Sequence, residues 1–158
     1  MKNRYLFRAK CKNYDEPIWA IGYLQDLNNG KEPHTLCIRP LDGDFQYDKE
    51  IALGAAEVVD VDTVGQCTGV KDKNGKLVFE GDIIKFGFGN AILYGIVEWQ
   101  TEYDPCFGIN WISYEYKDGH EKENEPELPE DALCVWGYRS EIIGNIYDNS
   151  ELLKEATQ

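Results

Sequence analysis

The sequence is poor in positive charge and has no long apolar run. Its 158 residues include 16 Lys and Arg against 29 Asp and Glu, so the formal net charge is −13. A negatively charged protein repels phosphate, which excludes nonspecific electrostatic binding to DNA, RNA or anionic lipid. We therefore expect no direct nucleic-acid partner. No apolar stretch has the length of a membrane span or of a signal-peptide core. We therefore expect a cytoplasmic protein without a membrane partner.

Cysteine and histidine are sparse and widely spaced. The chain has five cysteines and two histidines, and no two cysteines form a CxxC pair. This spacing is not that of a zinc or redox motif, so we predict reduced, mostly buried thiols, no metal site and no cofactor. A nucleophilic cysteine paired with His34 or His120 is the alternative interpretation. The cysteines are Cys11, Cys37, Cys67, Cys106 and Cys134.

Turn signals and alternating patterns outnumber helix signals, which predicts a mostly β fold. Asn-Gly or Asp-Gly dipeptides at 29–30, 74–75 and 118–119 predict type I′ hairpin turns. Asn149 or Ser150 caps a predicted short helix through Lys154, and a short turn is expected at 50–56. Alternation predicts strands with one buried face at 5–11 and 107–111. Further strands are expected at 18–24, 35–39, 77–79, 82–88, 91–99 and 141–147.

Charge is unevenly distributed along the chain. Residues 115–131 hold eight acidic and two basic residues, which gives −6, together with two prolines. Since these carboxylates repel one another and little apolar surface is present, we predict a long mobile loop there. The opposite extreme is the first strand, with Arg4, Arg8, Lys10 and Lys12. These residues could contact phosphate or an acidic partner, but we favour a charged edge strand that discourages edge-to-edge pairing.

Three segments resemble the motifs of one family of phage and prophage proteins. Residues 63–84 (TVGQCTGVKDKNGKLVFEGDII) are similar to the central motif of the YopX family. Residues 143–153 (IGNIYDNSELL) resemble its terminal motif, and residues 5–9 (YLFRA) resemble its opening strand. The three segments occur in the family's order and span almost the whole chain. The chain departs from the family pattern at Lys10, Cys67 and Ser150.

The resemblance implies a mostly β phage protein without an established activity. It also implies an SH3-like barrel around residues 80–84 and a homo-oligomer, with a hexamer as the candidate ring. We interpret the motif residues as structural, because Asn-Gly and Glu-Gly-Asp make sharp turns and the other glycines allow bulges or close backbone approach. No ligand-binding residue is predicted. The motif residues are Thr63, Gly65, Gln66, Thr68, Gly69, Asn74, Gly75, Glu80, Gly81, Asp82, Gly144, Asn145 and Tyr147.

Together these observations predict an N-terminal β lobe over residues 1–62 and an SH3-like β-barrel over 63–158. The acidic loop is inserted between late strands of the barrel, and a short helix follows at the C-terminus. The expected function is a non-catalytic binding or assembly module acting in the host cytoplasm. The alternative is an acidic effector that sequesters a host nucleic-acid-binding protein. An enzyme is the third hypothesis, but no paired carboxylate motif is recognisable, so no catalytic residue is predicted.

Overall fold

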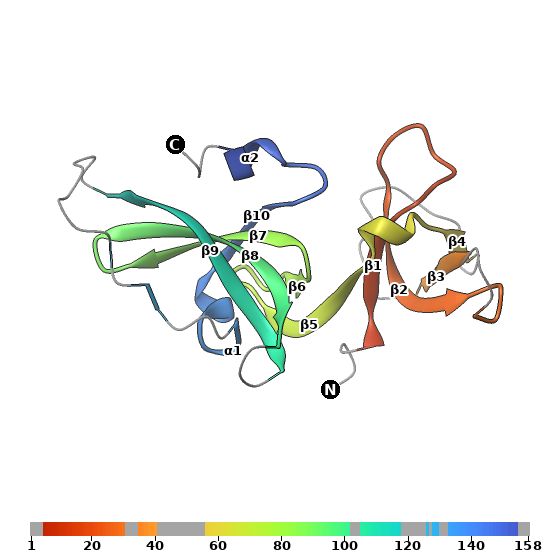
Figure 1. Ribbon diagram of the computed structural model, residues 1–158, viewed down its shortest axis with the longest axis horizontal. Helices are drawn as coiled ribbons and strands as arrows, with labels where there is room; N and C mark the ends of the chain where they lie inside the picture. The colour runs from red at the N-terminus through yellow and green to blue at the C-terminus, as the bar shows by residue number, and fades with distance from the viewer. Residues whose placement is uncertain are drawn as a thin grey trace. The chain divides into compact units, whose positions relative to one another are not determined.

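The computed structural model describes residues 5–30, 35–40, 56–101, 105–117, 126, 128–129 and 133–154. Most of its regular elements are antiparallel strands (Figure 1), so the predicted mostly β fold is confirmed. The chain divides into two compact units, Met1–Cys67 and Thr68–Gln158. We predicted a boundary after residue 62, whereas this division falls after Cys67, inside strand β5 (Gly65–Lys71).

The first sheet has the hydrogen-bonded order β4-β3-β2-β1-β5-β6. Strand β1 lies between two neighbours, since Phe7 is opposite Gly22 of β2 and also opposite Gln66 of β5. The predicted charged edge strand is therefore wrong: β5, distant in sequence, supplies the second neighbour. The strands are β1 (Phe7–Lys10), β2 (Trp19–Asp26), β3 (Leu36–Pro40), β4 (Glu57–Val58), β5 and β6 (Leu77–Phe79).

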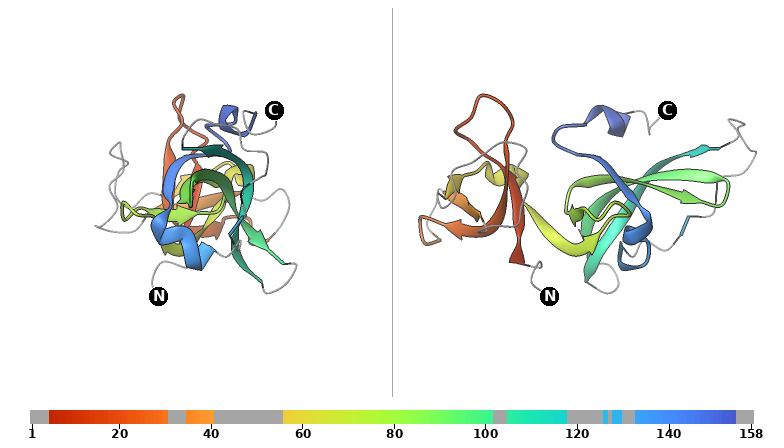
Figure 2. Two further views of the ribbon diagram at one scale, coloured as in Figure 1. Left: turned by 90° about the vertical axis from the view of Figure 1, so that its left-hand side faces the viewer. Right: turned by 180° about the vertical axis from the view of Figure 1, so that it is seen from behind.

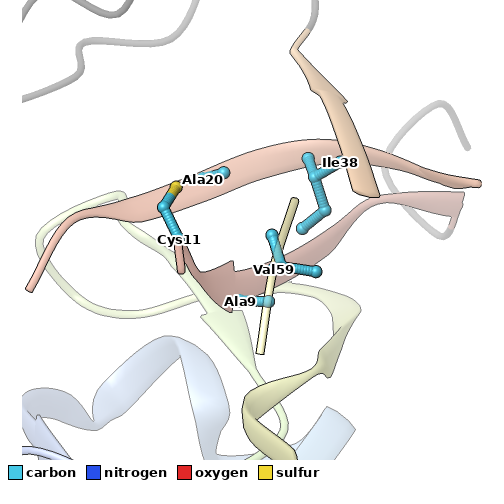
Figure 3. Close-up of a cluster of buried hydrophobic side chains, with 5 residues drawn as sticks. All are labelled: Ala9, Cys11, Ala20, Ile38 and Val59. Carbon is cyan, nitrogen blue, oxygen red and sulfur yellow. The ribbon is translucent and has the colours of Figure 1, made fainter. Parts of the chain in front are cut away.

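The core of the first unit is built from small and branched side chains on one face of β1 to β3. The buried residues converge from three strands and the segment after β4 (Figure 3). Ala9 is directly opposite Ala20 in the register, so two methyl groups leave room for the larger side chains above them. Because side chains alternate along a strand, burying Ala9 sends Arg8 and Lys10 to the opposite face. The cluster is Ala9, Cys11, Ala20, Ile38 and Val59.

The second sheet has the order β10-β7-β8-β9 and forms most of the second unit. Its core face carries Ile84, Val97 and Ile109, which are buried together with Val78 and with Leu133 of the short helix α1 (Leu133–Trp136). Helix α1 packs against β9 (Figures 1 and 2). Neither sheet closes on itself over the described ranges, so the SH3-like barrel is not confirmed. The strands are β7 (Asp82–Phe88), β8 (Ala91–Gln100), β9 (Cys106–Tyr116) and β10 (Glu141–Asn145).

The start of the predicted acidic loop is part of a strand. Glu115 and Tyr116 belong to β9, and the Tyr94 hydroxyl donates to Glu115 Oε1 at 2.6 Å. Burial and this hydrogen bond raise the pKa of Tyr94 to about 12. The predicted loop was therefore wrong at its first residues, because alternation continues through them. Most of its remainder, the dipeptide at 118–119 and most of the turn at 50–56 lie outside the described residues.

The two Asn-Gly turns that the structure describes differ in backbone conformation. At Asn29 and Gly30 both φ angles are positive, 50° and 79°. These residues lie in the longer connection between β2, which ends at Asp26, and β3, which begins at Leu36, and not in a two-residue hairpin turn. In the turn between β5 and β6, Gly75 has φ 82°, but Asn74 is not among the residues with positive φ. The predicted type I′ turn is therefore wrong at this position, although the hairpin is present.

The remaining elements are short. Helix α2 (Glu151–Lys154) is the predicted C-terminal helix, whereas the 3-10 turns η2 (Val61–Thr63) and η3 (Gly137–Arg139) and helix α1 were not predicted. No helix in the described part of the chain combines the length and apolar character needed to cross a membrane.

We predict that thiol reagents distinguish the five free cysteines. Cys134 is exposed, whereas Cys11, Cys37 and Cys67 are buried, and burial raises the pKa of the Cys11 thiol to about 11. Because the thiolate is the reactive form, Cys134 should react first with a maleimide at neutral pH and Cys11 should stay unmodified. Mass mapping after labelling measures this order, and labelling in urea is the control in which all five react. Rapid native labelling of Cys11 would contradict the buried position.

Candidate functional site

The carboxylate of Asp72 joins two distant segments of the second unit. Asp72 is 4% exposed and follows β5 directly. Its Oδ1 accepts the backbone N–H groups of Asn74 at 2.9 Å and Lys76 at 2.8 Å, and its Oδ2 accepts the N–H of Ile142 at 3.3 Å. Since a carboxylate is a stronger acceptor than a neutral group, these bonds fix the β5–β6 turn onto strand β10.

Neighbouring backbone groups reinforce the same junction. The Lys73 N–H donates to the Ser140 carbonyl at 2.9 Å, and the buried Ser140 hydroxyl donates to the Gly137 carbonyl at 2.7 Å. Glu141 contacts Lys73 Nζ at 2.8 Å and Lys85 Nζ at 3.5 Å. The hydrogen bond from Lys73 lowers the pKa of Glu141 below its usual value. The turn, η3 and β10 are thus connected by both backbone and side-chain contacts.

The turn between β6 and β7 meets the terminal motif in the same unit. Gly81 has φ 81°, its N–H donates to the Val97 carbonyl at 2.8 Å, and its carbonyl accepts the Ile146 N–H at 2.9 Å. A Cβ at Gly81 would lie 3.3 Å from the Tyr147 ring. The buried Asp82 accepts the Phe79 N–H at 2.8 Å through Oδ2 and lies opposite Asn145 in the register. The central and terminal motifs therefore pack together.

Two asparagines shape the chain after β10. Asn145 Oδ1 accepts the N–H groups of Tyr147 and Asp148, both at 3.0 Å. Asn149 Oδ1 accepts the Asn145 N–H at 3.2 Å and occupies the position that a Cβ on Gly144 would take. Glycine at 144 is therefore required by the side chain of Asn149, and strand β10 is irregular at this point.

The predicted motif residues are distributed over both units. In the first unit, Thr63 Oγ1 accepts the Lys10 N–H at 2.9 Å, while Gly65 and Gln66 pair with β1. In the second unit, Thr68 Oγ1 donates to the Val78 carbonyl at 2.9 Å. Gly69 has φ 78°. The other motif residues lie in or beside the contacts described above: Asn74, Gly75, Glu80, Gly81, Asp82, Gly144, Asn145 and Tyr147.

A different set of side chains lies on the face of the first unit's sheet opposite the Ala9 cluster. Arg8 and Lys10 are half-buried on this face, and the Nε and Nη2 atoms of Arg8 are buried. Lys10 is opposite Trp19 in the register, and Arg8 is opposite Ile21. The Arg8 Cζ lies 4.8 Å and the Lys10 Nζ 5.5 Å from the centroid of the Trp19 ring. Such cation–π contacts hold two long side chains beside one aromatic ring.

The same face continues onto β3. Tyr23, 46% exposed, is opposite Arg39, and Arg39 Nη2 donates to the Gln25 Oε1 at 3.5 Å. Alternation adds Ile21 and Cys37, and Cys37 is fully buried, so part of this face is covered. The charge of the basic side chains on this face is opposite in sign to the net charge of the chain. We name it the cationic face: Arg8, Lys10, Trp19, Tyr23, Gln25 and Arg39.

Sequence reasoning missed several residues that these two regions depend on. Asp72 had a usable signal, because Asp two residues before Asn-Gly is typical of an Asx turn. No sequence signal pointed to Ser140, and the role of Trp19 can be recognised only once the register of β1 on β2 is known. Within the described ranges, no group of three or more His, Cys, Asp or Glu side chains is arranged to hold a metal ion.

We predict that Asp72→Asn lowers the free energy of unfolding by about 1–3 kcal/mol, because an amide cannot accept bonds at both positions and leaves a buried group without its partner. Urea unfolding followed by fluorescence measures the change. Glu98→Gln on β8 of the same unit is the matched control and should stay within about 0.5 kcal/mol of wild type. Equal stability of the two variants would show that the carboxylate does not hold the junction.

We predict that Gly144→Ala destabilises the second unit by roughly 1–3 kcal/mol, because its methyl group overlaps the Asn149 side chain. Asn149→Ala removes that overlap but also the bond to the Asn145 N–H. In a double-mutant cycle, the combined variant should therefore be more stable than the sum of the two single changes predicts. Additive effects would contradict the contact.

The sequence comparisons bear on these motifs. The family model described as YopX protein matches residues 6–154, nearly the whole chain. No curated protein matches the chain. The matched range includes the junction of the central and terminal motifs and also the first sheet. The chain therefore belongs to the YopX family.

Proposed function

We propose that this protein is a non-catalytic binding or assembly module, encoded by a phage or prophage and acting as a homo-oligomer in the host cytoplasm. The observation that carries the proposal is how the motif's polar groups are used. Asp72, beside the predicted motif residues, has both carboxylate oxygens bonded to backbone N–H groups. Thr68 and Asn145 likewise bond to the backbone.

A catalytic carboxylate must exchange a proton with a substrate within hydrogen-bond reach. The oxygens of Asp72 instead accept hydrogen bonds from the β5–β6 turn and from β10. This carboxylate therefore has a structural role. The motif residues therefore support a structural role, in which they hold the fold that carries the binding surfaces. On the cationic face, Tyr23, Gln25 and Arg39 are exposed, which supports binding over catalysis.

Exposed aromatic side chains support an assembly role. Tyr5 is 73% exposed, Tyr138 61% and Trp99 48%, and aromatic residues of this kind are enriched in protein interfaces. Trp99 also stacks edge-on against Phe107 at 5.0 Å, so its ring is held in one orientation. A pre-ordered aromatic residue loses less side-chain entropy when a partner covers it.

We predict that the protein elutes as an oligomer whose mass is a multiple of 18.1 kDa, with a hexamer as the candidate. Gel filtration coupled to light scattering, at tens of micromolar protein and at two salt concentrations, measures this. We expect only a modest salt dependence if aromatic contacts dominate assembly. A mass near 18.1 kDa across that range would contradict assembly.

Capture from host lysate separates the proposed module from the alternative hypothesis. A nucleic-acid-binding protein as the main captured partner would favour the acidic effector, because a net charge of −13 can mimic phosphate. Any other stoichiometric protein partner supports the binding module. Absence of both self-association and a captured partner would contradict the proposed function.

A further inference from the structure

We propose that the outer edge of strand β9 pairs with β9 of a second copy of this chain, so that two copies of the second sheet join into one. The inference rests on the proposed homo-oligomer and deepens it, since it assigns the surface through which copies contact one another. A strand at a sheet edge presents unpaired N–H and C=O groups, and native proteins shorten, cover or cap such strands to prevent further pairing.

Three of the four sheet edges that the structure describes are protected in this way. The first sheet ends at β4 and at β6, which have only two and three residues. The second sheet ends on one side at β10, where side chains accept the outward N–H groups. Asp72 Oδ2 accepts that of Ile142 at 3.3 Å. Asn149 Oδ1 accepts that of Asn145 at 3.2 Å. A further strand would therefore find these donors occupied.

Strand β9 is the fourth edge and differs from the other three. It is the longest described strand, with 11 residues, and it contains no proline, lysine or arginine. Its register on β8 shifts once, opposite Tyr94 and Gly95, and is regular on both sides of that point. Within the described ranges, β9 pairs with β8 alone. Alternate residues of an edge strand direct N–H and C=O groups away from the sheet, so β9 can accept another strand.

The accessible part of this edge runs from Asn110 to Glu115. Asn110, Tyr114 and Glu115 are exposed, whereas Gly108 and Ile109 are buried, which limits the open edge to the second half of β9. In the part of the chain that the structure describes, no backbone group of residues 110–115 forms a hydrogen bond outside the ladder with β8. The edge is therefore open where it is exposed.

The distribution of charge favours a second copy as the occupant. Copies that each carry −13 repel one another, so their contact surface has to be poor in charge. Strand β9 meets this condition, because Glu115 is its only charged residue. Antiparallel pairing of a strand with its own copy is two-fold symmetric. A two-fold axis at the centre of residues 110–115 places Glu115 opposite the partner's Asn110, which keeps the two carboxylates apart.

The same register places Tyr114 opposite the partner's Trp111, so two aromatic side chains meet across the new strand pair. Tyr114 is 40% exposed, and its ring centroid lies 5.7 Å from that of Tyr116 in a T-shaped arrangement. The neighbouring ring restricts the rotamers of Tyr114 before a second copy arrives, so pairing costs less side-chain entropy. Lysine at position 114 would remove the aromatic contact and add a residue by which native edges resist pairing.

The test is gel filtration coupled to light scattering on the full chain, with Tyr114→Lys and the matched control Tyr14→Lys. Both tyrosines are 40% exposed, and each substitution raises the net charge by one, from −13 to −12. Tyr114→Lys should reduce the mass to about half of the wild-type value at the same concentration, because a two-fold contact joins copies in pairs. Tyr14→Lys should keep the wild-type mass. Circular dichroism and the melting temperature establish that both variants fold.

Hydrogen exchange on the wild-type protein gives a second readout that needs no variant. Backbone amides of residues 110–115 should exchange at least about tenfold more slowly at a concentration where copies associate than at one where they separate, because pairing supplies acceptors to the edge amides. Strand β1 is the internal control, since it is paired on both sides and its amides should exchange equally at the two concentrations.

Three results would overturn the inference while the homo-oligomer stands: a folded Tyr114→Lys variant with the wild-type mass, equal loss of mass in Tyr114→Lys and Tyr14→Lys, or exchange at residues 110–115 that stays constant while the mass changes. A wild-type mass near 18.1 kDa at every concentration would instead contradict the proposed assembly, and the inference with it. Slow exchange of these amides only after host lysate is added would assign the edge to another protein and also overturn self-pairing.

Discussion

Three backbone N–H groups converge on one buried carboxylate in the second unit. Through Asp72, a hairpin turn and a strand that are 70 residues apart in sequence share a single acceptor. Strand β10 pairs with β7, so the β5–β6 turn is fixed relative to the second sheet. The hydrogen bond between Lys73 and Ser140 also connects the turn to η3 and, through η3, to α1, whose Leu133 is part of the core. A neutral side chain at this position would leave buried donors unsatisfied, which makes the carboxylate a requirement for the junction.

How much of the fold is predictable depends on whether its cause is local. Strands β6 and β7 follow from local composition and agree with the expected ranges. Strand β5 was missed because two glycines and a cysteine interrupt its pattern, and α1 because it has only four residues. The error about β1 has a non-local origin. Its composition suits an edge strand, and only the pairing with β5 reveals that it is internal.

The candidate sites divide in the same way. The glycines at 75 and 81 were expected to make turns, and both have positive φ. The reason for Gly144 was not predictable, since the side chain that excludes a Cβ belongs to Asn149. The basic residues of β1 were visible in the sequence, but their meaning depends on Trp19, which the register places opposite Lys10. Contacts between segments, rather than residue types, carry this information.

Strand β5 belongs to both units, and this limits how such proteins can be recombined. Gly65 and Gln66 pair with β1, while Thr68 bonds to β6. A hybrid joined at Cys67 would draw one continuous strand from two parents. If their joint were misaligned by one residue, every side chain beyond it would move to the other face of the sheet. Exchange of the first unit between relatives therefore has to preserve the phase of this strand, which favours crossovers outside residues 65–71.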